Sequence, residues 1–213
     1  MNTVIASIVR EYGPLSDSVH GVTYDGQSIW FATGKQLHAL DPASGKTLRS
    51  LDVSANAGTA FDGTHIFQIA DGRIQKINPQ TGEVLSTIPT PRGDDSSGLA
   101  WAEGTLWVGR HKDRCIDQVD PETGAVLRSI ESNRYVTGVT WVDGELWHGT
   151  WEHDVSELRR IDPSTGKVLE TLNMPSGVHV SGLESDGGDQ FFCGGGNSKT
   201  IRTISRSKQR PAP

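Results

Sequence analysis

The sequence predicts an all-β protein, a five-bladed β-propeller with four antiparallel strands per blade. Two observations lead to this prediction. A unit with a period of roughly 40 residues recurs along the chain, and each copy holds short apolar segments separated by turn residues. The clearest copy is residues 137–167, against which the other copies are compared.

In this copy Gly138 opens the unit and an apolar segment follows it. Asp143-Gly144 is typical of a tight hairpin turn, because both residue types tolerate positive φ. Pro163 and Gly166 mark a second turn, where proline fixes φ and glycine occupies a position that a bulky side chain resists. Four strands are therefore expected. The first is at residues 139–141, the second begins at residues 146–147 and ends at a loop around residues 151–154, and the third and fourth are at residues 158–161 and 168–172.

Three features of this unit recur at matching positions. The blade-opening glycines, spaced by 37, 40, 40 and 44 residues, are Gly21, Gly58, Gly98, Gly138 and Gly182. The second-strand aromatics are Trp30, Phe67, Trp107, Trp147 and Phe192. The turns from proline to glycine are Pro42–Gly45, Pro79–Gly82, Pro121–Gly124 and Pro163–Gly166. Such sheets cannot bury their own faces and must pack on copies of themselves, so five glycines predict five blades with the aromatics between them.

The last repeat lacks a fourth strand, whereas residues 4–12 form an apolar segment ahead of the first repeat. We therefore expect this N-terminal strand to complete blade five, which hides an open sheet edge. The repeats fill residues 1–204, a single domain, and leave residues 205–213 as a flexible C-terminal tail that carries a few basic residues.

The composition limits the functional classes. The chain has 213 residues, a formal net charge of −6 and a pI of about 5.6, so no nucleic-acid partner is expected. No apolar run is long enough to span a membrane, and no secretory signal is recognisable, so a cytoplasmic location is expected. Cys115 and Cys193 lie in different blades and are expected to be free thiols. The oligomeric state is not apparent from the sequence.

In a propeller the blade-opening segments and the loops between second and third strands meet at one mouth of the central channel, where a ligand site is expected. In the ring of blade-opening segments, the residues that immediately precede the glycines are His20, Ala57, Ser97, Thr137 and Ser181.

Residues 141–168, WVDGELWHGTWEHDVSELRRIDPSTGKV, resemble the W-V-D-G-E-I-W-A-N-V-W and R-I-D-P-x-T-G-K-V patterns of the glutamine cyclotransferase family. These are five-bladed propellers that close N-terminal glutamine to pyroglutamate. The resemblance covers most of the chain and implies the same fold and blade count, and Trp151 matches the family's loop tryptophan. However, the family carries a proton-transferring glutamate in the mouth ring where this chain has Ala57, so a general acid–base carrier is missing there.

Histidines form the most suggestive group at the mouth. Ring closure places blade five beside blade one, which predicts that His179 and His20 are near each other, with Glu152 and His153 of the blade-four loop beside them. Imidazole can serve as base, acid or metal ligand near neutral pH, so these four are the candidate catalytic residues. The alternative is that they are solvated rim residues.

The candidate ligand-binding residues are Tyr135, Trp151, Arg110 and His111. Arg110 and His111 could hold an anionic group by charge-assisted hydrogen bonds, although exposed loop charge accounts for them equally well. His148 and Cys193 share a register in their second strands and are expected to pack between blades.

We therefore expect a small-molecule-binding propeller with a histidine-dependent lyase, cyclase or hydrolase activity on a small polar or anionic substrate. The alternative is a non-catalytic propeller that binds a ligand or a protein, and authentic glutaminyl-peptide cyclotransferase activity is disfavoured by Ala57. No cofactor is required by the sequence, and a divalent metal at the channel mouth is compatible with the histidines.

Overall fold

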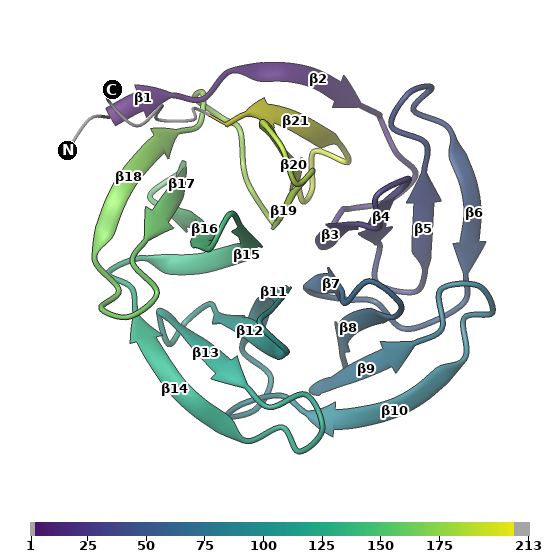
Figure 1. Cartoon of the computed structure of the whole chain (residues 1–213). Coiled ribbons are helices and arrows are strands. Elements are labelled where there is room, and N and C mark those ends of the chain that lie inside the picture. Colours follow the sequence, from purple (N-terminus) through teal and green to yellow (C-terminus); the bar gives the residue numbers. More distant parts are fainter. Residues whose placement is uncertain (1–2, 207–213) are drawn as a thin grey trace.

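The computed structural model describes residues 3–206 as a ring of five sheets around a central channel (Figure 1). The predicted five-bladed β-propeller is confirmed. Blade one is β3 (Gly21–Tyr24), β4 (Ile29–Ala32), β5 (Leu37–Leu40) and β6 (Thr47–Leu51). Blade two is β7 (Thr59–Phe61), β8 (Ile66–Ala70), β9 (Arg73–Ile77) and β10 (Val84–Pro89). Blade three is β11 (Ser96–Ala102), β12 (Thr105–Arg110), β13 (Cys115–Val119) and β14 (Val126–Glu131).

Blade four is β15 (Tyr135–Val142), β16 (Glu145–Glu152), β17 (Val155–Ile161) and β18 (Val168–Asn173). Blade five is β19 (Gly182–Ser185), β20 (Gln190–Gly194), β21 (Ile201–Ser205) and β2 (Ile8–Tyr12). The first strand of each blade lies nearest the channel in Figure 1, and the outermost strand forms the perimeter. Nowhere in residues 3–206 is there a helix that could cross a membrane.

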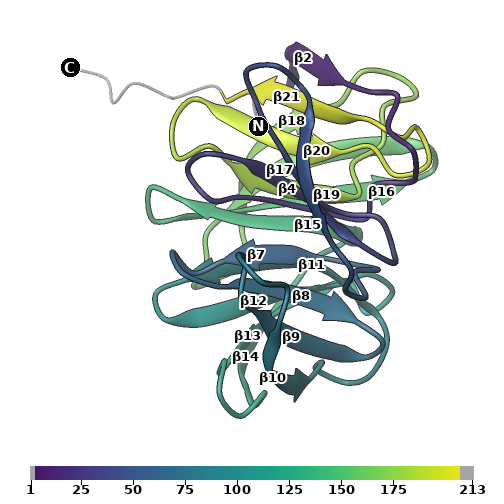
Figure 2. The same ribbon diagram turned by 90° about the vertical axis from the view of Figure 1, so that its right-hand side faces the viewer.

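The N-terminal segment closes the ring as predicted. β2 pairs antiparallel with β21, with Tyr12 opposite Ile201, and the two strands lie side by side in Figures 1 and 2. The segment is not one continuous strand, however. β1 (Thr3–Ile5) pairs in parallel with β18, which makes blade four five-stranded. The crossing is held by two backbone hydrogen bonds, from the Ala6 amide to the Asn173 carbonyl and from the Ser205 amide to the Ser7 carbonyl.

The end of the repeat region lies slightly beyond the expected boundary. Ser205 is the last residue of β21, and Arg206 is buried, with its guanidinium bonded to Asp143 at 2.9 Å and to Glu145 at 3.0 Å. The rest of the expected tail, residues 207–213, lies outside the described residues.

The core consists of apolar layers between neighbouring blades. One layer joins blades four and five through Trp147 and Phe191, whose ring centroids are 5.0 Å apart. The expected inter-blade tryptophans are all buried, with 1% of Trp30, none of Trp107 and 1% of Trp147 exposed. Each blade therefore depends on both neighbours for its apolar burial. Loss of one blade from the ring would expose the two apolar layers on either side of it.

Arginines on outer strands bind the proline-containing turn of the next blade. Arg10 donates to the Pro42 carbonyl at 2.7 Å, and Arg128 donates to the Pro163 carbonyl, also at 2.7 Å. Arg49 makes the same contact with the Pro79 carbonyl. The Arg128 guanidinium also lies 4.9 Å from the centre of the Trp107 ring, so one side chain joins the core of its own blade to its neighbour.

The blade-opening glycines are required by close approach of the inner strands. A Cβ on Gly98 would lie 2.6 Å from the Val139 amide nitrogen, and one on Gly58 would lie 2.5 Å from the Leu99 nitrogen. A Cβ on Gly182 would lie 2.8 Å from the Val22 nitrogen, which continues the contact across the closure of the ring. These neighbours are backbone atoms and cannot rotate away, so the width of the channel is set by glycine.

We predict that Gly98→Ala lowers the free energy of unfolding by about 1–3 kcal/mol, because the added methyl group must push two blades apart. The matched control is Gly188→Ala, where a Cβ would meet only side-chain atoms of Asp186 at 3.4 Å or more. Urea denaturation of both variants measures the difference. Equal stability of the two variants would show that the inner strands can separate without cost.

Candidate functional site

The blade-opening segments and the loops between second and third strands lie on one rim of the channel. Val19, ahead of β3, bridges Gly196 in the β20–β21 loop, and Gly34 in the β4–β5 loop bridges Ala55 ahead of β7. Both bridges join neighbouring blades. Backbone bridges therefore connect blade five to blade one and blade one to blade two at this rim, and side chains from sequence-distant segments meet on it.

A hollow of about 340 Å³ lies on this rim, where blades three, four and five meet. Its lining brings together three predicted site residues, His111, Trp151 and His179. The other lining residues are Thr137, Val180, Ser181, Gly195, Gly196 and Asn197. The volume falls within the range of small-molecule sites, and the lining combines one large aromatic wall with several polar groups.

His111 is held in a defined orientation. Its Nδ1 lies 3.0 Å from the Val136 carbonyl oxygen, and its ring stacks on Tyr135 with centroids 4.9 Å apart. A carbonyl oxygen can only accept, so Nδ1 must carry the hydrogen. In the neutral imidazole, Nε2 is then a proton acceptor, and it has no partner within residues 3–206.

Trp151 and His179 also line the hollow. Their ring centroids are 6.1 Å apart in an edge-on arrangement. The Trp151 Nε1 and the Thr137 Oγ1 are buried and have no hydrogen-bond partner within the described residues. A buried donor without a partner is costly, so these two groups are the clearest indication that the hollow is suited to a polar ligand.

Glu152 and Tyr135 do not line this hollow but support a residue that does. The Glu152 carboxylate binds Arg114 at 2.7 Å, and the Arg114 guanidinium lies 4.3 Å from the centre of the Tyr135 ring. Tyr135 in turn stacks on His111. The three side chains form a supporting column, in which Glu152 neutralises the arginine instead of facing a histidine.

Arg110 is not available to a ligand at the mouth. Only 1% of it is exposed, and its guanidinium donates to the carbonyls of Pro91 and Gly93 and to the Asp113 carboxylate at 2.9 Å. These bonds fix the segment between β10 and β11. Arg110 thus has a structural role in holding the connection between blades two and three, because a buried charge is costly unless it is hydrogen-bonded.

His20 and His153 lie away from the hollow. His20 does not line it, and partial burial lowers the pKa of its imidazole. His153 is exposed at the β16–β17 hairpin with a φ of 51°. The structure therefore brings His179 together with His111 and not with His20 or His153.

The sequence analysis missed Glu184 of the inner strand β19. The residues at the equivalent position of the five inner strands, two after each blade-opening glycine, are Thr23, Ala60, Ala100, Thr140 and Glu184. Glu184 is the one ionisable residue among these five. Its carboxylate accepts from Thr23 at 2.7 Å, from Thr140 at 2.5 Å and from the Ser185 amide at 2.8 Å.

Burial raises the pKa of Glu184 to about 7, against the opposing effect of the three hydrogen bonds. Its exposed fraction is intermediate. Within residues 3–206 no arginine or lysine is bonded to it. The Glu184 carboxyl group is thus held by neutral donors and changes charge near neutral pH.

The environment of the two cysteines does not favour a catalytic role. Cys115 and Cys193 are free and buried, as expected, and burial raises the pKa of both thiols, that of Cys115 to about 11. A thiol is the unreactive form, so neither is a nucleophile near pH 7. No group of three or more His, Cys, Asp or Glu side chains in residues 3–206 is arranged to hold a metal ion.

Comparison with solved structures gives the same fold. The crystal structure of the Myxococcus xanthus glutaminyl cyclase matches with a TM-score of 0.79 and 16% identity, over 95% of this chain and 96% of that chain. The RRP9 WD40 repeats match with a TM-score of 0.59 and 11% identity, over 96% of this chain and 99% of that chain. Neither a family model nor a curated protein matches the sequence. The chain is a five-bladed β-propeller whose fold is similar to that of a glutaminyl cyclase, which confirms the resemblance at the level of the fold.

We predict that Glu184→Gln stabilises the protein at pH 8 but not at pH 5. The raised pKa means that the ionised carboxylate is disfavoured in the folded state, so the parent loses stability as the pH rises from below the unfolded value of 4.5 through about 7. Glutamine does not titrate, and at pH 8 the variant should exceed the parent by on the order of 2 kcal/mol.

Urea denaturation of parent and variant at pH 5, 6, 7 and 8 measures this difference. Glu122→Gln, at an exposed turn position, controls for the general loss of a negative charge. A difference between Glu184→Gln and the parent that stays constant across this range would contradict the assignment of a near-neutral pKa to the Glu184 carboxyl group.

Proposed function

We propose that this propeller binds a small polar molecule in the mouth hollow and acts on it by histidine-dependent proton transfer, as a lyase, cyclase or hydrolase. The observation that carries the proposal is the fixed tautomer of His111. Its Nδ1–H is bound to the Val136 carbonyl, which leaves the Nε2 lone pair as an unoccupied base beside a ligand-sized hollow.

The other side chains in and around the hollow can return the proton, orient the ligand and hold the His111 ring in place. His179 is exposed and provides a second imidazole that can return the proton. The unpartnered Trp151 Nε1 and Thr137 Oγ1 can orient a carbonyl or carboxylate oxygen of the ligand, and the indole face covers its apolar part. The column of Tyr135, Arg114 and Glu152 keeps the His111 ring in place.

A specific observation favours the alternative, a non-catalytic ligand-binding propeller. Histidine bases are commonly oriented and made more basic by a carboxylate, but the nearby Glu152 is committed to Arg114 at 2.7 Å. The His111 Nδ1 is bound to a neutral carbonyl instead. In this alternative the same hollow holds the ligand without converting it.

Glutaminyl-peptide cyclisation is not the reaction we propose, although a glutaminyl cyclase has a similar fold. The resemblance places that family's glutamate at position 57, where this chain has alanine. The candidate bases that line the hollow, His111 and His179, come from blades three and five. A different placement of the base implies a different substrate geometry.

We predict that small polar compounds exist whose stabilisation of the protein depends on both mouth histidines. A thermal-shift screen of carboxylic acids, carboxamides, amines and a glutaminyl peptide would compare the parent with His111→Ala and His179→Ala. Compounds bound at the mouth should raise the melting temperature of the parent and not of either variant, since about 1–3 kcal/mol of contacts is lost.

His65→Ala is the matched control, because His65 lies in the β7–β8 hairpin and pairs with Asp62. Conversion of each stabilising compound is then followed by mass spectrometry, with no pyroglutamate expected from the peptide. Binding with no conversion would favour the non-catalytic alternative. Compounds whose effect is unchanged in both mouth variants, or lost equally in the control, would contradict a mouth site.

A further inference from the structure

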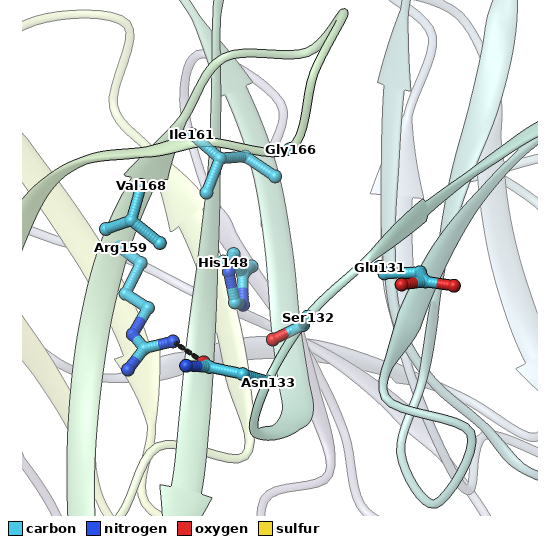
Figure 3. Close-up of a pocket in the computed structure, with 8 residues that line it drawn as sticks. All are labelled: Glu131, Ser132, Asn133, His148, Arg159, Ile161, Gly166 and Val168. Carbon is cyan, nitrogen blue, oxygen red and sulfur yellow. Dashed lines mark hydrogen bonds between the residues drawn. The ribbon is translucent and has the colours of Figure 1, made fainter.

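A second hollow lies between blades three and four and shares no lining residue with the mouth hollow. We call it the lateral hollow. Its volume is about 370 Å³. Figure 3 shows its lining, which consists of Glu131, Ser132, Asn133, His148, Arg159, Ile161, Gly166 and Val168. Two of these side chains are polar and almost fully buried, His148 with 1% and Arg159 with 8% exposed.

His148 presents a hydrogen-bond acceptor to the lateral hollow. Its Nδ1 lies 3.2 Å from the Gly149 carbonyl oxygen and must therefore donate its hydrogen. Burial lowers the pKa of the imidazole to about 4, so the ring is neutral at pH 7. The Nε2 then carries a lone pair with no partner among residues 3–206, in a side chain that Figure 3 places at the centre of the hollow.

Arg159 presents donors beside this acceptor. It is directly opposite His148 in the β16–β17 ladder, so the two side chains project from the same face of the sheet. Its Nε donates to Glu157 at 2.7 Å and its Nη1 donates to the Asn133 side chain at 2.6 Å, a contact drawn in Figure 3. Its Nη2 has no hydrogen-bond partner within residues 3–206 and can donate to a ligand.

The charges behind the lateral hollow do not balance. Glu157 is shared between Arg159 and Arg134, the latter at 3.4 Å. Glu152 is shared between Arg134 at 4.0 Å and Arg114 at 2.7 Å. Three guanidinium groups therefore face two carboxylates. Glu131, a third carboxylate in the lining, is exposed, lies across the hollow from Arg159 in Figure 3, and forms no ion pair with the three arginines within residues 3–206.

From these contacts we propose that the lateral hollow binds a small α-hydroxy carboxylate. Its carboxylate would accept from Arg159 and neutralise the surplus positive charge, as guanidinium groups commonly do for carboxylates. Its hydroxyl group would donate to the His148 Nε2. Ile161 and Val168 would contact its hydrocarbon part. The two recognising side chains are directly opposed in the β16–β17 ladder and project from one face of the sheet, so adjacent groups of one small ligand can reach both.

The proposal predicts discrimination among three probes that differ by one group. Lactate carries both the carboxylate and the hydroxyl group, propionate lacks the hydroxyl group, and methyl lactate lacks the negative charge. We expect lactate to shift the backbone amide NMR signals of Ser132 and Asn133 and the side-chain nitrogen signals of His148 in a saturable manner. Propionate should bind about tenfold more weakly and methyl lactate should not saturate.

Two variants locate the site. His148→Val introduces the residue that blade three carries at the same register, Val108, and should make the lactate and propionate dissociation constants equal. Arg159→Met should abolish binding of both anions. His179→Ala, at the mouth, should bind lactate as the parent does. If Arg159→Met fails to fold, the probe series and His148→Val still decide the question.

The proposal is overturned if lactate produces no saturable shift at Ser132, Asn133 and His148. It is also overturned if lactate and propionate bind the parent equally, or if His148→Val retains the parent's preference for lactate. A shift that is confined to His111 and His179 would assign lactate to the mouth and would likewise contradict a lateral site.

Discussion

The contact between neighbouring inner strands is the constraint on which the rest of this structure depends. At each blade-opening glycine the backbone of the next blade lies where a side chain would begin, as at Gly98 and Val139. This close approach sets the diameter of the channel and brings five sequence-distant segments onto one rim. The core layers and the arginine contacts between blades then stabilise an arrangement that the glycines make sterically possible.

The same constraint determines what the mouth can do chemically. Because the strands are close, the hollow is small, and the side chains that line it come from three blades. The proton acceptor of the hollow is the Nε2 of His111 in blade three, and its tautomer is fixed by the Val136 carbonyl of blade four. The site therefore exists only when the two blades are packed together. The same docking of blades holds the Glu184 carboxylate of blade five between threonines of blades one and four.

The fold was readable from the sequence because it is encoded repeatedly. Glycine spacing, hairpin turns and second-strand aromatics each specify a blade, and the missing fourth strand of the last repeat specifies the closure. The division of the N-terminal segment was not readable, because both halves are apolar and only the geometry shows that Thr3–Ile5 pair with blade four. Each half covers an open sheet edge, β1 that of β18 in blade four and β2 that of β21 in blade five.

The site was readable only in part. Trp151 and Glu152 are consecutive residues of β16, which extends further than the sequence suggests, so their side chains face opposite sides and only the tryptophan lines the hollow. Arg110 is a polar residue whose partners include several backbone carbonyls, which no sequence pattern identifies. Glu184, in contrast, had a signal, because a carboxylate stands where the other repeats have threonine or alanine.

The central functional claim is that His111 offers its Nε2 as a base at the channel mouth. The most direct test is a long-range proton–nitrogen NMR spectrum of histidine-labelled protein, assigned with His111→Ala, at a pH where the imidazole is neutral. The account predicts the tautomer that is protonated at Nδ1, fixed by the Val136 carbonyl. A His111 signal from the tautomer protonated at Nε2 would show that this nitrogen already carries a hydrogen, and it would contradict the proposed role.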